Sequence, residues 1–173
     1  MAMDQAITLP QLLASREDRW HRQMELVRDN PGLTLVCLTV VMPGSVKRTA
    51  ASAVVARAAM DALRDEFGTS IRQCMERDLV TGFEAFVLVD RRPDETKRLT
   101  CLIEDSHPLG RLFDMDVIDA SATPLSRTAL GFSPRRCLLC GAEARYCMRN
   151  GTHTLSEIQA HINEMIDGYV HRL

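Results

Sequence analysis

The sequence predicts an α+β or α/β fold: one mixed β-sheet of about four or five strands with flanking helices. Three observations support this expectation. Helical and extended patterns alternate along the chain. The 173 residues are 46% hydrophobic and 25% charged, which suits a single domain, residues 1–173, with a sizeable core. The sequence contains no internal repeat, low-complexity tract or linker that would divide it.

The N-terminal part predicts a helix followed by a strand. Thr8 and Gln11 have the spacing of a capping box, and apolar residues near one face extend the helix to just before Asn30. The run LTLVCLTVVM at residues 33–42 is apolar and β-branched, and the turn pair Pro43-Gly44 follows it. We therefore expect a buried strand that enters a tight loop.

The middle of the chain alternates between helix and strand. Residues 50–67 are rich in helix formers, place apolar residues on one stripe and stop at Gly68, which predicts a helix. Residues 71–82 show no informative pattern and receive no assignment. Residues 83–90 (FEAFVLVD) predict a strand. Residues 94–106 fit either a helix or a strand through LTCLI, and we favour the helix.

The last third begins with extended segments and ends in a helix. Residues 111–119 (RLFDMDVID) alternate in the manner of a strand, and a return strand near residues 125–128 would form a hairpin with it. Thr154 and Glu157 have capping-box spacing, and apolar residues with a 3.6-residue period follow them. We therefore expect a C-terminal helix.

Composition narrows the functional classes. Lys and Arg total 21 against 23 Asp and Glu, and the formal charge of −2 argues against a general nucleic-acid binder. Only two of the 21 basic residues are lysines, which favours bidentate Arg contacts to phosphate or carboxylate. Neither a secretory signal nor an apolar run of membrane-spanning length is visible, so we expect a cytoplasmic protein without a membrane partner.

The most informative motif is Asp114-Met115-Asp116, inside the strand expected over residues 111–119. Residues two apart on a strand face the same side at a separation of about 6.6 Å, so both carboxylates project together. Such a pair can hold Mg²⁺, which completes its coordination with water and phosphate oxygens. An edge strand with a solvated acidic face explains the same motif, and both interpretations stay open.

Arginines and a histidine flank this motif in the sequence. A carboxylate pair beside several guanidinium groups is typical of a site where metal and Arg share a polyphosphate. His107 precedes Pro108 and either reaches the site, as a base or phosphate ligand, or fixes the turn by hydrogen bonding. Gly110 and Arg111 come just before the strand, and Arg127, Arg135, Arg136, Arg145 and Arg149 follow it.

A second candidate lies in the loop between the first strand and the second helix, residues 42–48. Its backbone N–H groups at Gly44 and Ser45, the following helix N-terminus and Lys47 can face an anion. The P-loop pattern is absent. An ordinary strand-to-helix turn is the alternative.

A third candidate is the series Cys137, Cys140, Cys147 and His153, with the pattern C-x2-C-x6-C-x5-H. Three thiolates and an imidazole would form a closed tetrahedral site for a structural Zn²⁺. Alternatively, residues 137, 140, 144 and 147 share one face of a helix, where small buried side chains permit close packing.

Several sequence blocks occur together in a distinctive order. They are Ser15-Arg16-Glu17-Asp18, Pro43-Gly44-Ser45-Val46-Lys47, SHPLGRLFDMDV at 106–117, Leu125-Ser126-Arg127, RRCLLC at 135–140 and Cys147-x-Arg149-x3-His153. Over about residues 15–155 this order resembles the apo-citrate lyase phosphoribosyl-dephospho-CoA transferase family, also called citrate lyase holo-acyl-carrier-protein synthases. Ser45 departs from the pattern, since many relatives carry Pro there, and this affects only details of that loop.

The resemblance implies a group-transfer reaction. The 2′-(5″-phosphoribosyl)-3′-dephospho-CoA prosthetic group would pass from its triphosphoribosyl precursor to a serine of the citrate lyase acyl carrier protein, the γ subunit. The serine hydroxyl would attack the α-phosphorus, and pyrophosphate would leave. This fits a chain that lacks G-x-S-x-G and H-E-x-x-H. By analogy, the topology would be nucleotidyltransferase-like.

Within this reaction, residue type and spacing assign a role to each candidate residue. Asp114 and Asp116 would hold Mg²⁺ against the phosphates, as paired aspartates do in nucleotidyltransferase-like proteins. Glu104, preferred over Asp119, would be a third metal ligand or the base for the serine proton, with His107 beside it. The residues expected to bind the substrate phosphates are Gly44, Ser45, Lys47, Arg111, Arg127, Arg135 and Arg136.

Two other functions fit the same residues. The chain could be a zinc-stabilised protein-interaction module without catalysis, in which the arginines bind an acidic partner. It could also be a nucleotidyltransferase that acts on an ordinary nucleotide. An interaction module would not depend on Asp114 and Asp116, whereas either transferase would.

Overall fold

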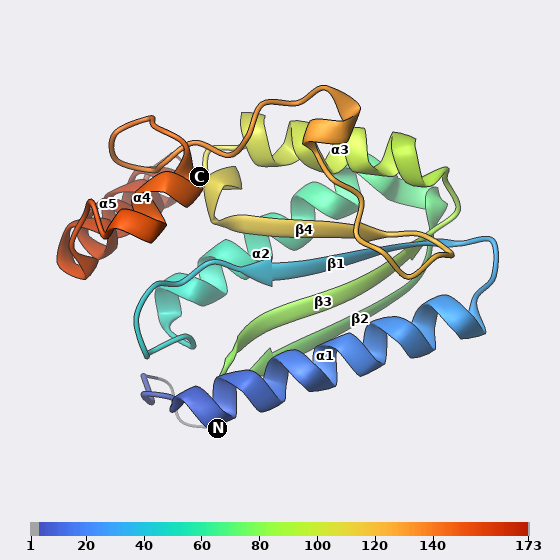
Figure 1. The fold of residues 1–173 in the computed structure, drawn as a ribbon, viewed down its shortest axis with the longest axis horizontal. Helices are drawn as coiled ribbons and strands as arrows, with labels where there is room; N and C mark the ends of the chain where they lie inside the picture. Colours follow the sequence, from blue (N-terminus) through green and yellow to red (C-terminus); the bar gives the residue numbers. More distant parts are fainter. Residues whose placement is uncertain (1–3, 173) are drawn as a thin grey trace.

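One four-stranded antiparallel sheet, with strand order β2-β3-β1-β4, organises the chain (Figure 1). The computed structural model describes residues 4–172. Its strands are β1 (Thr34–Val40), β2 (Ile71–Leu79), β3 (Gly82–Val89) and β4 (Phe113–Ile118). The α+β class and the number of strands are confirmed.

The sheet is antiparallel throughout, whereas we expected a mixed sheet. Helical crossovers do connect two pairs of parallel strands, β1 with β2 and β3 with β4. In each case, however, another strand lies between the two: β3 separates β1 from β2, and β1 separates β3 from β4. Every hydrogen-bonded neighbour is therefore antiparallel.

Helices cover both faces of the sheet (Figure 1). α1 (Leu9–Asp29) crosses one face, and α2 (Ala50–Phe67) covers the other. α3 (Pro93–Ser106) runs beside β4, and α5 (Leu155–Val170) packs against the end of the α2 layer, with the short α4 (Ala144–Asn150) before it. The capping boxes predicted at Thr8 and Thr154 are both formed.

The core lies on the α2 side of the sheet. Val36 and Leu38 of β1 and Phe113 and Met115 of β4 are all 0% exposed there. A smaller cluster around Leu26 fills the space between α1 and the sheet. Because strand side chains alternate, each strand divides its residues between these two layers.

The outer edge of β4 is closed by side chains. Glu104 accepts a hydrogen bond from the Met115 N–H at 2.8 Å, and Lys97 donates to the Met115 carbonyl at 2.9 Å. Arg135 donates to the carbonyl of Phe113. These contacts satisfy backbone groups that an edge strand otherwise leaves unpaired.

Two sequence assignments need correction or completion. Residues 71–79, which we left unassigned, form β2. The return strand expected at residues 125–128 does not form: one bridge joins Ile118 to Pro124, and a short 3₁₀ turn begins at Thr128. Pro124 has no N–H to continue a ladder. Residues 94–106 are helical, as favoured.

No helix within residues 4–172 has both the length and the apolar composition needed to cross a bilayer.

Candidate functional site

Asp114 and Asp116 lie side by side on the α1 face of β4. Phe113, Met115 and Val117 point into the core with 0% exposure, whereas the Asp114 side chain is 48% exposed and Asp116 is also exposed. The strand alternation that we predicted for this motif is therefore present. In register with β1, Asp114 lies opposite Thr39 and Asp116 opposite Cys37.

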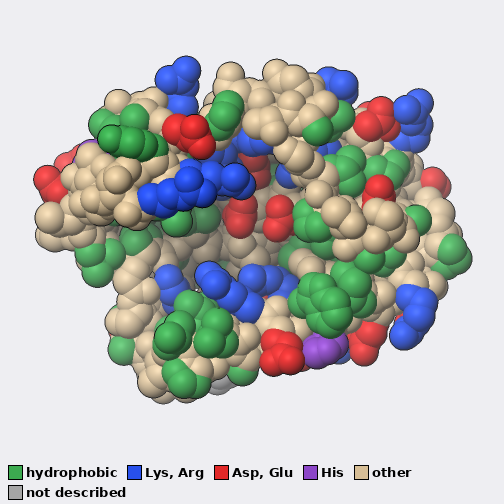
Figure 2. Space-filling view, viewed as in Figure 1, with side chains coloured by type: hydrophobic (Ala, Val, Ile, Leu, Met, Phe, Trp, Pro, Cys, Tyr) green, Lys and Arg blue, Asp and Glu red, His purple; other side chains and the backbone are tan. Residues whose placement is uncertain are grey.

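The molecular surface is hollowed on the face of the sheet that α1 crosses, the face on which Asp114 and Asp116 lie. Figure 2 shows this hollow in the middle of the face, with acidic side chains at its centre and Lys and Arg side chains above and below. Two groups of basic side chains lie on opposite sides of this hollow. We call Arg111, Arg127, Arg135 and Arg136 the α3-side rim, and Arg16, Arg19 and Lys47 the α1-side rim.

Arg135 connects the α3-side rim to the carboxylate pair. Its guanidinium lies 3.5 Å from Asp114 Oδ1 and 2.7 Å from Glu104 Oε1. Because the same side chain also donates to the backbone of β4, its position is fixed at three points. Arg135 therefore presents positive charge directly beside the pair.

Glu104 lies beneath the surface and positions the Arg135 guanidinium. The residue is 3% exposed, and it contacts Arg135, Arg127 at 3.8 Å and the Met115 N–H. Burial raises the pKa of Glu104, while Arg135 and the Met115 hydrogen bond oppose that shift. We expected a third metal ligand or a base here, but these contacts fit a positioning residue for Arg135 better.

The remaining members of the α3-side rim are partly committed to structural contacts. Arg111 donates to the carbonyl of Arg136, and burial followed by the nearby Arg135 lowers its pKa. Arg127 binds Asp105 at 2.6 Å. Arg136 donates to the carbonyl of Gly141 at 3.0 Å. The structure thus gathers all four predicted arginines at one side of the hollow.

The α1-side rim includes residues that the sequence analysis did not select. Arg19 of α1 binds the buried Glu84 of β3 at 3.3 Å, and Arg19 acts electrostatically on Asp116. Arg16, one helical turn earlier, acts on Lys47. The signal was available: both arginines lie on the charged face of the first helix, three residues apart, but a charged helix face is usually only solvated.

Lys47 is half-buried and turned back into its own loop. It donates to the carbonyl of Met42, and desolvation, with Arg16 as a second cause, lowers its pKa. A lysine with a lowered pKa loses its proton at a lower pH than an exposed lysine does. Its neighbour Arg16 remains exposed.

Gly44 has a specific packing reason to be glycine. Its φ is +87°, and a Cβ there would lie 3.1 Å from Gln159 Nε2 of α5. The carbonyl of Ser45 accepts a hydrogen bond from the Ile7 N–H at 2.9 Å. The loop is thus fixed between the N-terminal segment and α5, and the Ser45 residue itself is exposed.

The two aspartates influence each other. Desolvation raises the pKa of Asp116, and the neighbouring Asp114 carboxylate raises it further, against Lys97 and Arg135. Two close carboxylates with hard oxygen donors repel each other unless a cation lies between them. A cation placed between Asp114 and Asp116 would relieve this repulsion.

His107 faces away from this pair. Its Nδ1 accepts a hydrogen bond from the Leu109 N–H at 3.0 Å, and its ring packs against Phe113 and Tyr169 on the core side. Burial lowers its pKa. Of the two roles left open for His107, the geometry favours fixing the turn.

A second depression of the surface lies away from the hollow. A cavity of about 670 Å³ opens elsewhere, between Gly32, Ser70, Asp90 and Pro93. Neither carboxylate of the pair lines it. The candidate site is itself open to solvent, since the Asp114 side chain is 48% exposed, and an open surface suits a large substrate or a protein partner better than a small enclosed ligand.

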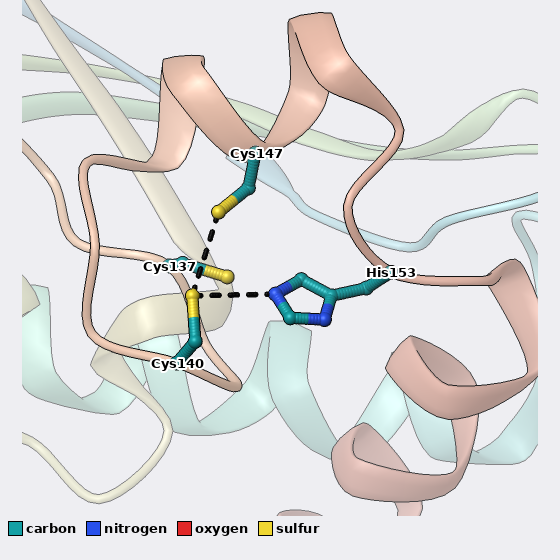
Figure 3. A group of neighbouring side chains, drawn as sticks. All are labelled: Cys137, Cys140, Cys147 and His153. Carbon is teal, nitrogen blue, oxygen red and sulfur yellow. Dashed lines mark hydrogen bonds between the residues drawn. The ribbon is translucent and has the colours of Figure 1, made fainter.

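The three cysteines and the histidine predicted together do converge (Figure 3). The ligand atoms of Cys137, Cys140, Cys147 and His153 all lie within 4.8 Å of one another. The alternative of a shared helix face is wrong, because α4 begins only at Ala144 and Cys137 and Cys140 lie in the loop before it. This cluster could hold a metal ion.

The thiols of Cys140 and Cys147 differ in pKa. The Ala142 N–H and then the hydrogen bond with His153 lower the pKa of Cys140 to about 6. Desolvation raises the pKa of Cys147 to about 11. All six cysteines of the chain are free thiols.

Comparison with known proteins identifies relatives along nearly the whole chain. Residues 7–169 match the family described as apo-citrate lyase phosphoribosyl-dephospho-CoA transferase. A Vibrio cholerae protein named "Probable apo-citrate lyase phosphoribosyl-dephospho-CoA transferase" is 40% identical over 171 residues, covering 96% of this chain and 95% of its own. A Streptococcus pyogenes protein of the same name is 31% identical (97% and 90% covered).

A third relative, from Shigella flexneri, extends this agreement. It is named "Apo-citrate lyase phosphoribosyl-dephospho-CoA transferase" and is 34% identical over 161 residues, covering 91% of this chain and 87% of its own. The relatives are thus named as transferases, and the blocks around the hollow lie within the matched residues. This chain therefore belongs to the apo-citrate lyase phosphoribosyl-dephospho-CoA transferase family.

Proposed function

We propose that this chain, acting as one cytoplasmic transferase domain, attaches the phosphoribosyl-dephospho-CoA group to a serine of the citrate lyase acyl carrier protein. The donor is 2′-(5″-triphosphoribosyl)-3′-dephospho-CoA, and pyrophosphate is released. Family membership supports the transferred group and the acceptor. The carboxylate pair between two basic rims supports the polyphosphate donor, because opposite charges there match a metal-bound triphosphate.

The carboxylate pair fits Mg²⁺ by the chemistry of its donors. Asp114 and Asp116 offer hard oxygens on an open surface, where substrate phosphates can complete the coordination. A bound Mg²⁺ would lower the negative charge of the phosphates. Asp114 and Asp116 would hold this ion, while Arg135 limits the negative charge of the pair itself.

The two basic rims would orient the donor. Arg111 and Arg135 are placed to contact the phosphates from the α3 side, with Arg127 and Arg136 behind them. From the α1 side, Lys47 and the loop N–H groups of Gly44 and Ser45 would contact the leaving phosphates, and we add Arg16 and Arg19 to this group. Holding the chain of phosphates at both ends aligns the α-phosphorus with the incoming serine.

The chemistry follows from this placement. The serine oxygen of the carrier forms a bond to the α-phosphorus, the bond to the pyrophosphate oxygen breaks, and the serine proton leaves to a base. Guanidinium groups stabilise the charge that develops on the phosphate oxygens and on the leaving group. Glu104 and His107 remain candidates for indirect roles, since one orients Arg135 and the other fixes the turn before β4.

A mass measurement tests this proposal. The chain is incubated with the apo carrier protein, Mg²⁺ and the triphosphoribosyl donor, and the intact carrier is weighed. We expect its mass to increase by one prosthetic group, with stoichiometric release of pyrophosphate. A carrier of unchanged mass, under conditions in which a family relative modifies it, would refute the transfer. An adduct formed with an ordinary nucleoside triphosphate but not with this donor would indicate a different nucleotidyltransferase.

A further inference from the structure

Residues 119–154 connect β4 to α5 and bury very little. Among them, Cys147 is the one residue whose surface is buried, and their only helices are the turn Thr128–Leu130 and α4. This segment nevertheless carries Arg127, Arg135 and Arg136 of the α3-side rim. A connection of this length without an apolar core needs another source of order.

The contacts that tie this segment to the body are mostly polar, and the strongest of them are those of Arg135 with Glu104, Asp114 and the Phe113 carbonyl. Arg98 donates to the Leu130 carbonyl at 3.2 Å, and Arg127, whose side chain is 13% exposed, binds the more exposed Asp105 at 2.6 Å. Leu138 packs partly against the core. These contacts lie at residues 127–138, whereas Cys140, Cys147 and His153 come later in the segment, so a cross-link between the cysteines and the histidine would order that later part as well.

A tight hairpin places the first two thiols of the cluster. The Cys137 N–H donates to the Ala142 carbonyl at 2.6 Å, and the Ala144 N–H donates to the Arg135 carbonyl at 2.8 Å. Gly141 closes the hairpin with φ +69°. Cys137 and Cys140 therefore face the same point from a short, rigid turn.

The other two ligands come from different pieces of the segment (Figure 3). Cys147 projects from α4, and His153 lies in the link just before Thr154 caps α5. Cys140 Sγ is 3.5 Å from Cys147 Sγ and 3.3 Å from His153 Nε2. Two sulfurs bound to one tetrahedral zinc at ~2.3 Å would lie ~3.8 Å apart, close to the spacing found here.

We propose that Cys137, Cys140, Cys147 and His153 bind one structural Zn²⁺, which orders residues 119–154 and holds Arg135 against Glu104 and Asp114. Four protein ligands leave no open coordination position, so the ion is structural. Arg135 lies two residues before Cys137 and pairs with Ala144 across the hairpin, so the metal fixes its backbone. The metal site stands independently of the proposed function, and only the importance of Arg135 rests on it.

Metal content gives the first test. The chain is purified untagged under reducing conditions, and zinc is measured by inductively coupled plasma mass spectrometry. We expect one zinc per chain in the wild type and in the control Cys74→Ser, whose exposed thiol lies on β2. Cys140→Ser and Cys147→Ser should lose the zinc. Cobalt loading of the wild type should give the visible absorption of tetrahedral Co²⁺ with thiolate ligands.

A second measurement tests the ordering role without any activity assay. Zinc is removed from the wild type with a chelator and then restored, and hydrogen exchange is followed by mass spectrometry. We expect faster exchange in residues 119–154 after removal, little change in β1 and β3, and recovery with added zinc.

The possible outcomes separate the two proposals. Wild-type chain that binds no more zinc than Cys140→Ser, even after reloading, would overturn the metal site. Zinc binding without any change of exchange in residues 119–154 would overturn its ordering role. Zinc-loaded, ordered protein that fails to modify the carrier would overturn the proposed function and leave the metal site intact.

Discussion

The side chains on the two faces of β4 differ in burial, although they alternate along a strand of six residues. Phe113, Met115 and Val117 are completely buried against the α2 side. Asp114 and Asp116, on the other face, are exposed in the hollow between the two basic rims. One strand thus carries the core and the candidate site together, and the period of two keeps them apart.

Residues that stabilise the fold and residues of the candidate site are therefore separate on this strand. Substitutions on the buried face should alter the free energy of unfolding, and those on the open face should alter transfer. A substitution that changes both would show that the two layers are coupled through the strand.

Phe113→Ala should have the largest effect, on stability. The ring is fully buried, and removing it leaves a cavity, which typically costs about 3–5 kcal/mol. Urea unfolding followed by circular dichroism measures this change. The variant should still transfer the group at low temperature in the fraction that is folded. A loss of less than about 1 kcal/mol would mean that the site collapses around the missing ring.

Asp116→Asn should reduce transfer by about 10²-fold or more, the scale of losing a major electrostatic contribution. Its stability should be unchanged or slightly higher, because one of two like charges is removed. Pyrophosphate release at saturating Mg²⁺ measures the rate. Asp90→Asn, at an exposed acid paired with Arg72, is the matched control and should keep full activity. Equal rates for both variants would remove the carboxylate pair from the mechanism.

His107 should have the smallest effect, on the pH dependence of stability. Burial lowers the pKa of His107 in the folded chain below its ordinary value of 6.5. The unfolded chain therefore takes up a proton on His107 at a higher pH than the folded chain does. Stability is therefore fully present above about pH 6.5 and falls as the pH decreases below it. His107→Gln should flatten that fall, whereas His21→Gln, at an exposed position on α1, should not. Thermal unfolding from pH 7.5 to 5 compares them, and equal slopes would contradict the prediction.

The long periodic elements were predictable from the sequence, and one edge strand was not. The helices with capping boxes and the apolar runs around Leu35 and Phe86 are each decided by local pattern. β2 carries charges on its exposed face, and an irregularity between Ile71 and Gln73 interrupts its alternation. Charged side chains on an edge strand protect it against aggregation. The same charges replace the alternation of apolar residues by which a strand is predicted from sequence.

The candidate site was predictable in its carboxylates but only in part in its surroundings. Two aspartates two residues apart on a strand must share a face, so their convergence followed from geometry. The convergence of Arg135 and Arg19 depends on how the 119–154 segment and α1 pack against the sheet. Likewise, the buried environment that turns Glu104 into a support for Arg135 arises only from tertiary packing.

The side chains along the outer edge of β4 have a consequence for assembly. With Lys97, Glu104 and Arg135 occupying its outward N–H and carbonyl groups, the sheet has no free ladder on that side for a strand from another chain. The opposite edge, β2, presents exposed charges such as Arg72 and Glu76. A carrier protein or a second copy that approaches along β4 must therefore be recognised by side chains and surface shape, because strand addition is blocked on that side.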